Sequence, residues 1–432
     1  MLTVYASMPP LRPVRKAPAA HPEPWTPSGL PPPPDRLAAA LGSEAVLVSW
    51  SGGTRAKLEP SGCVPGMAGG LVRRGALLTR SPAARSLHLE CGGWSAGAAD
   101  YQLVKLQAYL EALAAAGIAA VGLGQAEAAL GGSVLGPLVS AGPPVVCCNV
   151  VGFLPSVAVE RSGQQFVITS VVAAGVAGAT DPVQAVARLA TPEGSTLIIM
   201  ADLDPAGLAS LAAGVPSSAV VIARTDESGA TQPAGPCRIL PSSGSGAVQY
   251  WWALGADAYA TEAIADIVPD HPAIRSRIAA ANRLLGTLDF AMDAPTAPPP
   301  GTAFVGDAAC RSCHAQEFAV HAASRHALPK ARFSGTPTAN DPECLTCHTT
   351  GLGAIGGFSR RGQSEHGLNR IGCESCHGPG AAHVSARIAG DAVHAKLPRI
   401  TLAQCSTCHD AERNRQFDVH AAWNAIAHGP NR

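Results

Sequence analysis

Short apolar runs recur through residues 45–223 and predict buried β-strands. Each run is rich in Val, Ile, Ala and Leu, and turn-forming residues separate it from the next amphipathic segment. Runs of this length and flanking are typical of strands that are covered on both faces. The runs are Ala45–Val48, Ile118–Val121, Val145–Val151, Phe166–Val172, Thr196–Met200 and Ala219–Ala223.

Amphipathic segments lie between several of these runs and predict α-helices. Tyr101–Ala116 places apolar side chains three and four positions apart, and Gly117 follows as a helix stop. Asp181–Ala190 and Pro205–Ala213 show the same pattern. Strands that alternate with helices indicate an α/β domain.

The pattern changes on both sides of this α/β region. Residues 1–40 are rich in proline and are expected to be a disordered leader, followed by the α/β domain over residues 41–293. Residues 294–301, with the sequence APTAPPPG, are expected to be a proline-rich linker. Residues 302–432 hold short helical stretches, Gly-Pro turns and clusters of Cys and His, which favours a mainly α domain packed around large cofactors.

Composition sharpens this division. The chain carries 31 basic and 31 acidic residues, and this balance argues against a nucleic-acid partner, because such a contact needs a basic surface. No apolar stretch is long enough to suggest a membrane helix. Eight of the 13 cysteines and 11 of the 14 histidines lie after residue 300, so ligand chemistry is expected there.

The C-terminal region repeats the sequence Cys-x-x-Cys-His four times. This spacing lets two thiols bond the two vinyl groups of one haem and directs the next residue, His, at the iron. Four covalent haem c groups are therefore predicted. The thiols are Cys310 and Cys313, Cys344 and Cys347, Cys373 and Cys376, and Cys405 and Cys408, and the proximal iron ligands are His314, His348, His377 and His409.

Structural zinc is the main alternative for these motifs, because it also uses Cys-x-x-Cys pairs. Zinc does not require His directly after every second Cys, so covalent haem is the better interpretation. Seven further histidines are candidates for the sixth position of the irons, and we expect three or four of them to be ligands. They are His321, His326, His366, His383, His394, His420 and His428.

Residues 302–430 resemble the tetrahaem cytochrome c family that accepts electrons from hydroxylamine oxidoreductase, within the wider multihaem cytochromes c. The segment from Gly372 to Gly380, with the sequence GCESCHGPG, is the most specific part of the likeness. Further support comes from Phe304-Val-Gly before the first motif, His326 in Ser-Arg-His-Ala, the glycine-rich turn at 351–358, His383 after the third motif, and Phe417-Asp418 with the late His428.

This resemblance implies three distal iron ligands, His326, His383 and His428. Three distal ligands for four haems leave one iron open, and in the family it is the haem on the second motif, here His348. His321 stands where the family has an aromatic residue, so an additional ligand and a surface residue both remain as interpretations of it. The resemblance does not assign each distal His to a haem.

Residues 45–290 resemble, more weakly, the calcineurin-like metallophosphatase domain of 5′-nucleotidases, which implies a four-layer α/β sandwich. The likeness depends on landmarks that follow one another in the family's order. They are Leu58–Cys63, Gly69–Arg74, Leu87–Gly93, Gly122–Glu127 and Cys148–Val150.

The metal ligands of that family are mostly missing from this chain. Its activity needs two metals held by Asp, His and Asn. Here Trp50–Arg55 replaces the first Asp-x-His, Gly93 replaces the bridging Asp, and Gln125-Ala126 replaces the Asn-His pair. Met200–Leu203 and Ala223–Asp226 stand near the places of later ligands, so the domain is interpreted as a pseudo-enzyme that docks or scaffolds the cytochrome.

The sequence thus favours an extracytoplasmic electron-transfer protein without substrate chemistry of its own. Its partners are expected to be redox proteins, and membrane association and a multi-subunit assembly both stay open. Because c-type haem is normally attached outside the cytoplasm, a periplasmic or extracellular location is expected, although residues 1–35 show no secretory signal. The alternatives are a multihaem oxidoreductase that acts on a small nitrogen or oxygen species at an open iron and, less favoured, a metallophosphoesterase.

Overall fold

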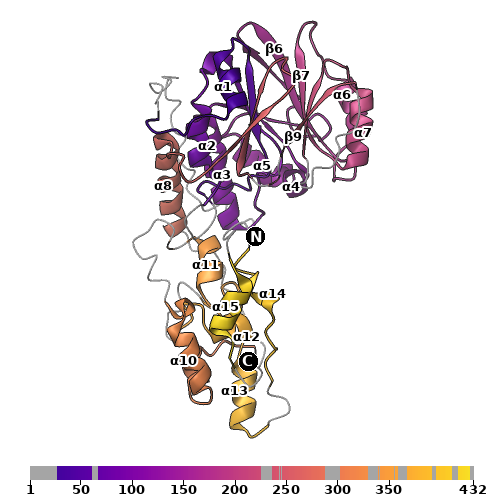
Figure 1. The fold of residues 1–432 in the computed structure, drawn as a ribbon. Coiled ribbons are helices and arrows are strands. Elements are labelled where there is room, and N and C mark those ends of the chain that lie inside the picture. Colours follow the sequence, from indigo (N-terminus) through magenta and orange to yellow (C-terminus); the bar gives the residue numbers. More distant parts are fainter. Residues whose placement is uncertain are drawn as a thin grey trace.

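A computed structural model of the chain has two parts, an α/β part above a smaller helical part in the view of Figure 1. In the residues that it describes, no helix is both long and apolar enough to cross a membrane. The structure describes residues 27–60, 67–224, 236–242, 244, 246–287, 302–328, 339, 341–354, 356–358, 367–391, 396–410 and 417–428.

The strands of the α/β part form two mixed sheets. The first has the order β11-β10-β1-β2-β3-β4, in which β1 to β4 are parallel, and the second has the order β5-β6-β7-β8-β9, in which β6 to β9 are parallel. The strands are β1 Leu47–Ser51, β2 Ser86–Glu90, β3 Ile118–Gly122, β4 Val145–Val146, β5 Val157–Arg161, β6 Gln164–Val172, β7 Thr196–Asp202, β8 Val220–Arg224, β9 Arg238–Ser242, β10 Val248–Ala253 and β11 Ala260–Ala263.

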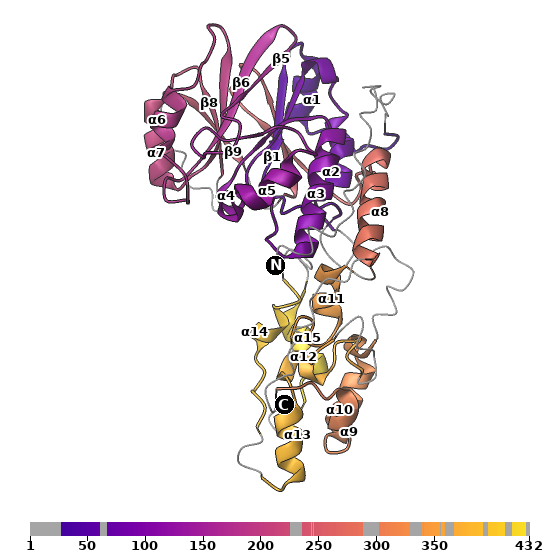
Figure 2. The ribbon, with the colours of Figure 1, turned by 180° about the vertical axis from the view of Figure 1, so that it is seen from behind.

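Helices cover the outer face of each sheet, which completes four layers and confirms the predicted α/β sandwich (Figure 2). Apolar side chains of the two sheets pack against each other, among them Trp50, Phe166 and Ile198. The helices of this part are α1 Asp35–Gly42, α2 Leu71–Leu78, α3 Asp100–Ala115, α4 Gln125–Leu130, α5 Gly132–Val139, α6 Pro182–Ala187, α7 Pro205–Gly214 and α8 Pro272–Thr287, with a 3-10 turn at Ala83–Arg85.

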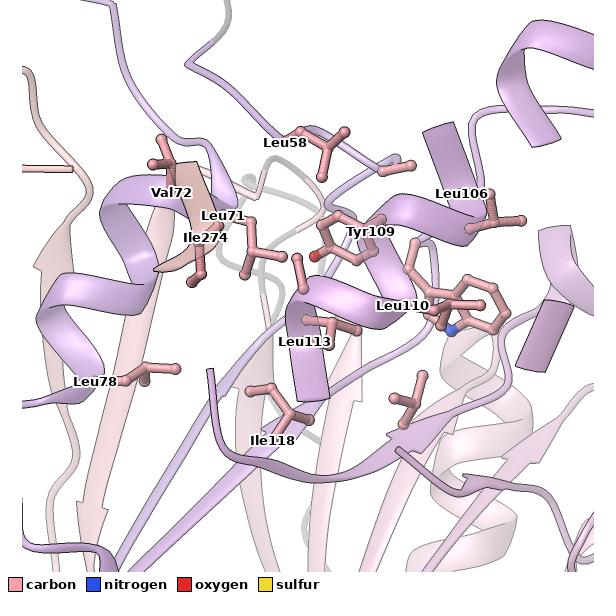
Figure 3. Close-up of a cluster of buried hydrophobic side chains, with 14 of the residues drawn as sticks. Leu58, Leu71, Val72, Leu78, Leu106, Tyr109, Leu110, Leu113, Ile118 and Ile274 are labelled. Carbon is pink, nitrogen blue, oxygen red and sulfur yellow. The ribbon is translucent and has the colours of Figure 1, made fainter. Parts of the chain in front are cut away.

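Helix α3 lies at the centre of the layer on the first sheet. Leu106, Tyr109, Leu110 and Leu113 project from it among side chains of α2, α8 and β3 (Figure 3). These side chains recur at spacings of three and four, so the helix buries one continuous apolar stripe. The predicted helix at Tyr101–Ala116 is thus confirmed within one residue at each end.

Two local predictions need correction. Residues 35–42 of the chain form α1 and Leu37 is fully buried, so the ordered domain begins before the end of the expected leader, whose residues 1–26 lie outside the described part. The run Val145–Val151 is a strand only at Val145–Val146. Beyond it the side chain of Asn149 binds the backbone of β6, accepting from Val172 N at 3.1 Å and donating to Val172 O at 2.8 Å, and so replaces strand pairing.

The second part is helical in the residues described, as predicted, and its apolar core is small. The buried apolar residues there are Leu345, Phe358 and Leu368. The expected linker at 294–301 lies outside the described residues. The helices are α9 Asp307–Arg311, α10 Ala315–Ala323, α11 Pro342–His348, α12 Cys373–His377, α13 Ala381–Ile388, α14 Leu402–Cys405 and α15 Val419–Ile426, with a 3-10 turn at Arg325–Ala327.

Candidate functional site

Helical backbone brings the two cysteines and the histidine of the motifs onto one face. Motif three is α12 itself, and motif two ends α11. In motifs one and four the amide of the His bonds the carbonyl oxygen of the first Cys, at 3.0 Å for His314 and 2.9 Å for His409. Residues three and four apart share a face of a helix, so both thiols and the imidazole point the same way.

Three of the four motif histidines each face a different one of the predicted distal histidines. The imidazole centroids are 6.0 Å apart for His314 and His383, 6.1 Å for His409 and His326, and 6.0 Å for His377 and His428. The partners lie far apart in the sequence and come from different elements. The structure therefore divides the three distal candidates among the first, fourth and third motifs, an assignment that the sequence did not provide.

The separation of these rings fits an iron between them. Metal–nitrogen bonds of about 2.0 Å on both sides, with each nitrogen about 1.1 Å from its ring centroid, place the centroids about 6.2 Å apart. The observed separations of 6.0–6.1 Å agree with this value. Direct ring stacking would give a shorter distance, and unrelated surface histidines would not repeat one distance three times.

Backbone carbonyls hold some of these rings in place. Nδ1 of His428 lies 2.9 Å from the carbonyl oxygen of Ile426, so Nε2 is the ring nitrogen available to a metal. A ring nitrogen held by a carbonyl fixes the tautomer and orientation of a metal-binding His. His321 differs, because its Nε2 lies 2.8 Å from the carbonyl oxygen of Ile371 and its ring is buried. This contact favours a structural role for His321 over that of an additional ligand.

Burial keeps several of these imidazoles neutral. It lowers the pKa of His326, His348, His377 and His409 below the ordinary value for histidine, and neighbouring histidines lower the pKa of the first three further. A metal binds the neutral imidazole, so low pKa values suit ligands. Phe417 also stacks on His409 with a centroid distance of 4.1 Å, which restricts rotation of that ring.

The attachment sites form a chain that does not follow the sequence order. The thiols of Cys310 in motif one and Cys373 in motif three lie close enough for each to shift the pKa of the other. Cys376 in motif three interacts electrostatically with Cys405 and Cys408 in motif four, and His409 in motif four with His348 in motif two. These interactions make motif three a neighbour of motifs one and four, and motif four a neighbour of motif two.

Two buried carboxylates hold motif three in register with the start of this part. Glu374, within the motif, accepts hydrogen bonds from Gly306 N at 2.7 Å and Gly380 N at 2.7 Å, and also from Val305 N. Asp307 accepts from Cys373 N at 2.8 Å. The motif alone does not predict this role of Glu374, because the role depends on contacts between distant segments.

In the α/β part, the ends of parallel strands meet where the resemblance implies the metal site of the family. The loops after β1 and β2 join through Gly53 N to Gly92 O at 3.0 Å. A Cβ atom on Gly53 would lie 2.2 Å from the carbonyl oxygen of Gly244, and one on Gly92 would lie 2.6 Å from Cα of Gly124. Backbone thus fills space that side chains with ligand atoms would need.

Two carboxylates at this edge already have partners within the protein. Asp202 accepts from Gln125 N at 2.8 Å and lies 3.8 Å from the guanidinium of Arg224. The buried carboxylate of Glu127 accepts from Gly93 N, Ser95 N and Gly124 N. In the described part of the chain, no three or more side chains of His, Cys, Asp and Glu form a cluster suited to a bare metal ion; Asp226 lies outside that part.

His88 in β2 is buried and bound within the α/β part. Its Nδ1 lies 2.7 Å from Oγ of Ser49, and the ring packs edge-on against Trp251. Burial, with smaller contributions from Arg74 and Arg161, lowers the pKa of His88 to about 3.

We expect His88 to make the α/β part sensitive to acid. The unfolded chain binds this proton near pH 6.5 and the folded chain only near pH 3, so the stability that the neutral ring contributes is present above pH 6.5 and is lost as the pH falls toward 3. The slope is at most about 1.4 kcal/mol per pH unit. Urea unfolding at pH 7 and pH 5 should show a smaller pH effect for His88→Gln, and an unchanged effect for the exposed control His420→Gln. Equal pH effects in His88→Gln and the parent chain would contradict this expectation.

Comparison with solved structures gives likenesses for the α/β part. The 5′-nucleotidase precursor of Thermus thermophilus aligns with a TM-score of 0.46 and 19% identity, over 56% of this chain and 59% of that one. The NAD nucleotidase of Haemophilus influenzae aligns with a TM-score of 0.45 and 13% identity, over 60% and 64%.

Comparison of sequences gives a likeness for the helical part. Residues 309–378 match the family of cytochrome c554 and c-prime. Cytochrome c-554 of Nitrosomonas europaea is 31% identical over 135 residues, which cover 24% of this chain and 57% of the relative. The C-terminal region of this chain therefore resembles the cytochromes c554, whose covalent c-type haem agrees with its Cys-x-x-Cys-His motifs.

Proposed function

We propose that the chain is an extracytoplasmic electron-transfer protein that carries four covalent haem c groups. Each group would be attached by the two thiols of one motif and bound at its iron by the motif His. His383, His326 and His428 would be the distal ligands of the haems on His314, His409 and His377. The observation that carries this proposal is the set of three imidazole pairs 6.0–6.1 Å apart.

The adjacency of the motifs supports transfer between haems. Side chains of neighbouring motifs lie close enough to shift one another's pKa at each of the three steps from motif one to motif two. Two imidazole ligands give an iron that changes oxidation state without exchanging a ligand. Electrons could then pass from haem to haem through the helical part, from one redox partner protein to another, without substrate chemistry.

The small apolar core of this part also supports bound haem. A domain of this size needs buried apolar area for stability, and the buried apolar side chains in the described residues after 301 form one small cluster. Porphyrin faces would supply the missing apolar surface. The residues of this part therefore fit haem in two ways. Their paired histidines have the separation that an iron needs, and their small apolar core leaves room for the porphyrins.

One alternative is a multihaem oxidoreductase that acts at the haem on His348. Two observations favour it. All three distal candidates lie opposite the motif histidines other than His348, and the haem on the second motif is open in the tetrahaem cytochrome family that this part resembles. Carbon monoxide or nitric oxide added to the reduced chain separates the two functions. A spectrum that does not change supports the carrier, and binding to one haem supports the oxidoreductase.

For the α/β part we propose a scaffold that derives from a phosphatase-like domain and has no phosphatase activity. The support is the replacement of ligand residues in the segment Trp50–Arg55, at Gly93 and at Gln125-Ala126, and the close backbone packing around Gly53 and Gly92. Two-metal hydrolysis needs ligands for both ions. Of the two carboxylates there, Asp202 accepts from Gln125 and lies near Arg224, and Glu127 accepts from three backbone amides.

Metal analysis of the purified chain tests both parts at once. We expect four iron atoms per chain and no other transition metal in stoichiometric amount. The pyridine haemochrome spectrum of the denatured chain should give the same count of haem c, and dialysis with zinc or manganese should leave the count of non-haem metal unchanged. Fewer than four haems would contradict the cytochrome assignment, and two tightly bound non-haem metals would contradict the inactive scaffold.

A further inference from the structure

The two parts of the chain meet at one charged side chain of α3. Nζ of Lys105 lies 2.7 Å from Oδ2 of Asp341 and 2.6 Å from Oε2 of Glu343. These two acidic residues begin α11, the helix that carries the second haem motif. Both views show α11 directly below the end of α3 (Figures 1 and 2).

Lys105 is unusual for a lysine at a contact between two parts of a chain, because it is almost fully buried, with 8% of its surface exposed. Burial alone would lower the pKa of Lys105, but Asp341 and Glu343 outweigh burial and raise it, so the side chain stays charged. A lysine is seldom buried unless it is paired. The contact is thus a built ion triad and not a chance surface pair.

Asp341 connects this triad to the haem motif. Its Oδ1 accepts from Glu343 N at 3.0 Å, which caps α11, while its Oδ2 binds Lys105. Its backbone oxygen accepts from the amides of Cys344 and Leu345, both at 3.0 Å. The same residue therefore fixes the first turn of α11 and ties it to the α/β part, and Glu343 directly precedes the first haem-binding thiol.

We propose that Lys105 is a positioning residue by which the α/β part fixes the attachment helix of the second haem and adjusts its reduction potential. This inference, which rests on the proposed function, gives the metal-free domain a specific task at one end of the haem chain. The ion triad has a net charge of −1. The potential of a haem depends on the charge and solvent exposure around it, so a change in the triad should alter the haem on His348 more than the others.

Two substitutions of opposite sign test the proposal in the full chain with its haems. Lys105→Met removes a positive charge and should lower the potential of one haem, whereas Glu343→Gln removes a negative charge and should raise it. The expected size is up to about tenfold in the one-electron equilibrium constant, which corresponds to about 59 mV. Lys105→Arg should restore most of the parent value, and Lys396→Met, at an exposed lysine elsewhere in the helical part, is the charge-matched control.

Hydrogen–deuterium exchange provides a second measurement that does not depend on the haem count. In Lys105→Met the amides of residues 343–348 should exchange several-fold faster, while those of α12 stay unchanged. Unaltered exchange in α11, or potentials that match the Lys396→Met control in both triad variants, would overturn the proposal. An iron count other than four would contradict the proposed function instead, and the exchange result would still decide the role of Lys105. Glu343, which is about half exposed, offers a variant that perturbs folding less than Lys105→Met.

Discussion

Replacement of His383 by alanine should leave the haem on His314 without its distal ligand. That haem would change from six-coordinate and low-spin to five-coordinate and high-spin, and about a quarter of the total haem would gain the ability to bind carbon monoxide. His326→Ala should do the same for the haem on His409, and His428→Ala for the haem on His377. The measurement is the number of carbon monoxide molecules bound per reduced chain, relative to the parent chain.

The matched control for these substitutions is His420→Ala. His420 is exposed on α15, two turns before His428, and its backbone amide binds the capping Asp418. Its replacement should leave carbon monoxide binding unchanged. His383→Met should keep a six-coordinate iron and raise its potential, because methionine opposite histidine favours the reduced state. If His383→Ala binds no more carbon monoxide than the parent chain, His383 is not the distal ligand.

The haem motifs could be predicted from sequence because their chemistry is local. A thiol pair and a histidine within five residues fix their own geometry as soon as one helical turn forms. The pairing of His314 with His383, or of His409 with His326, depends on how distant segments fold onto each other. A single sequence holds no signal for such pairs beyond its resemblance to a family.

The strands show the same division between local and distant causes. The runs that became β6, β7 and β8 are continuous and apolar because both faces of these strands are covered. The predicted length of the edge strand β4 was too great, because the side chain of Asn149 replaces strand pairing beyond Val146. The interdomain contact of Lys105 was not predicted, although Asp341-Pro342-Glu343 is a helix-start signature that could have marked the beginning of α11.

A buried ion pair holds the centre of the α/β part and carries the largest expected effect on its stability. Arg74 of α2 donates to the carboxylate of Glu90 at the end of β2, to Oε1 of Gln249 at 2.8 Å and to the carbonyl oxygen of Leu89 at 2.9 Å. Tyr109 and Thr54 donate to the other oxygen of Glu90. Every charge in this network is satisfied, although Arg74 and Glu90 are almost completely buried.

Arg74→Met should therefore lower the free energy of unfolding by about 3–5 kcal/mol, because it leaves Glu90 buried without its counter-ion. Guanidinium unfolding, followed by the fluorescence of Trp50, Trp94, Trp251 and Trp252, measures the change. Arg73→Met is the matched control, since Arg73 is only partly buried and its guanidinium binds the carbonyl oxygen of Met67; we expect a loss of about 1 kcal/mol or less there. Losses of equal size in both variants would mean that the pair contributes little beyond a surface arginine. The double variant Arg74→Met with Glu90→Leu should recover part of the loss, because an apolar pair removes the uncompensated charge that makes the single variant costly.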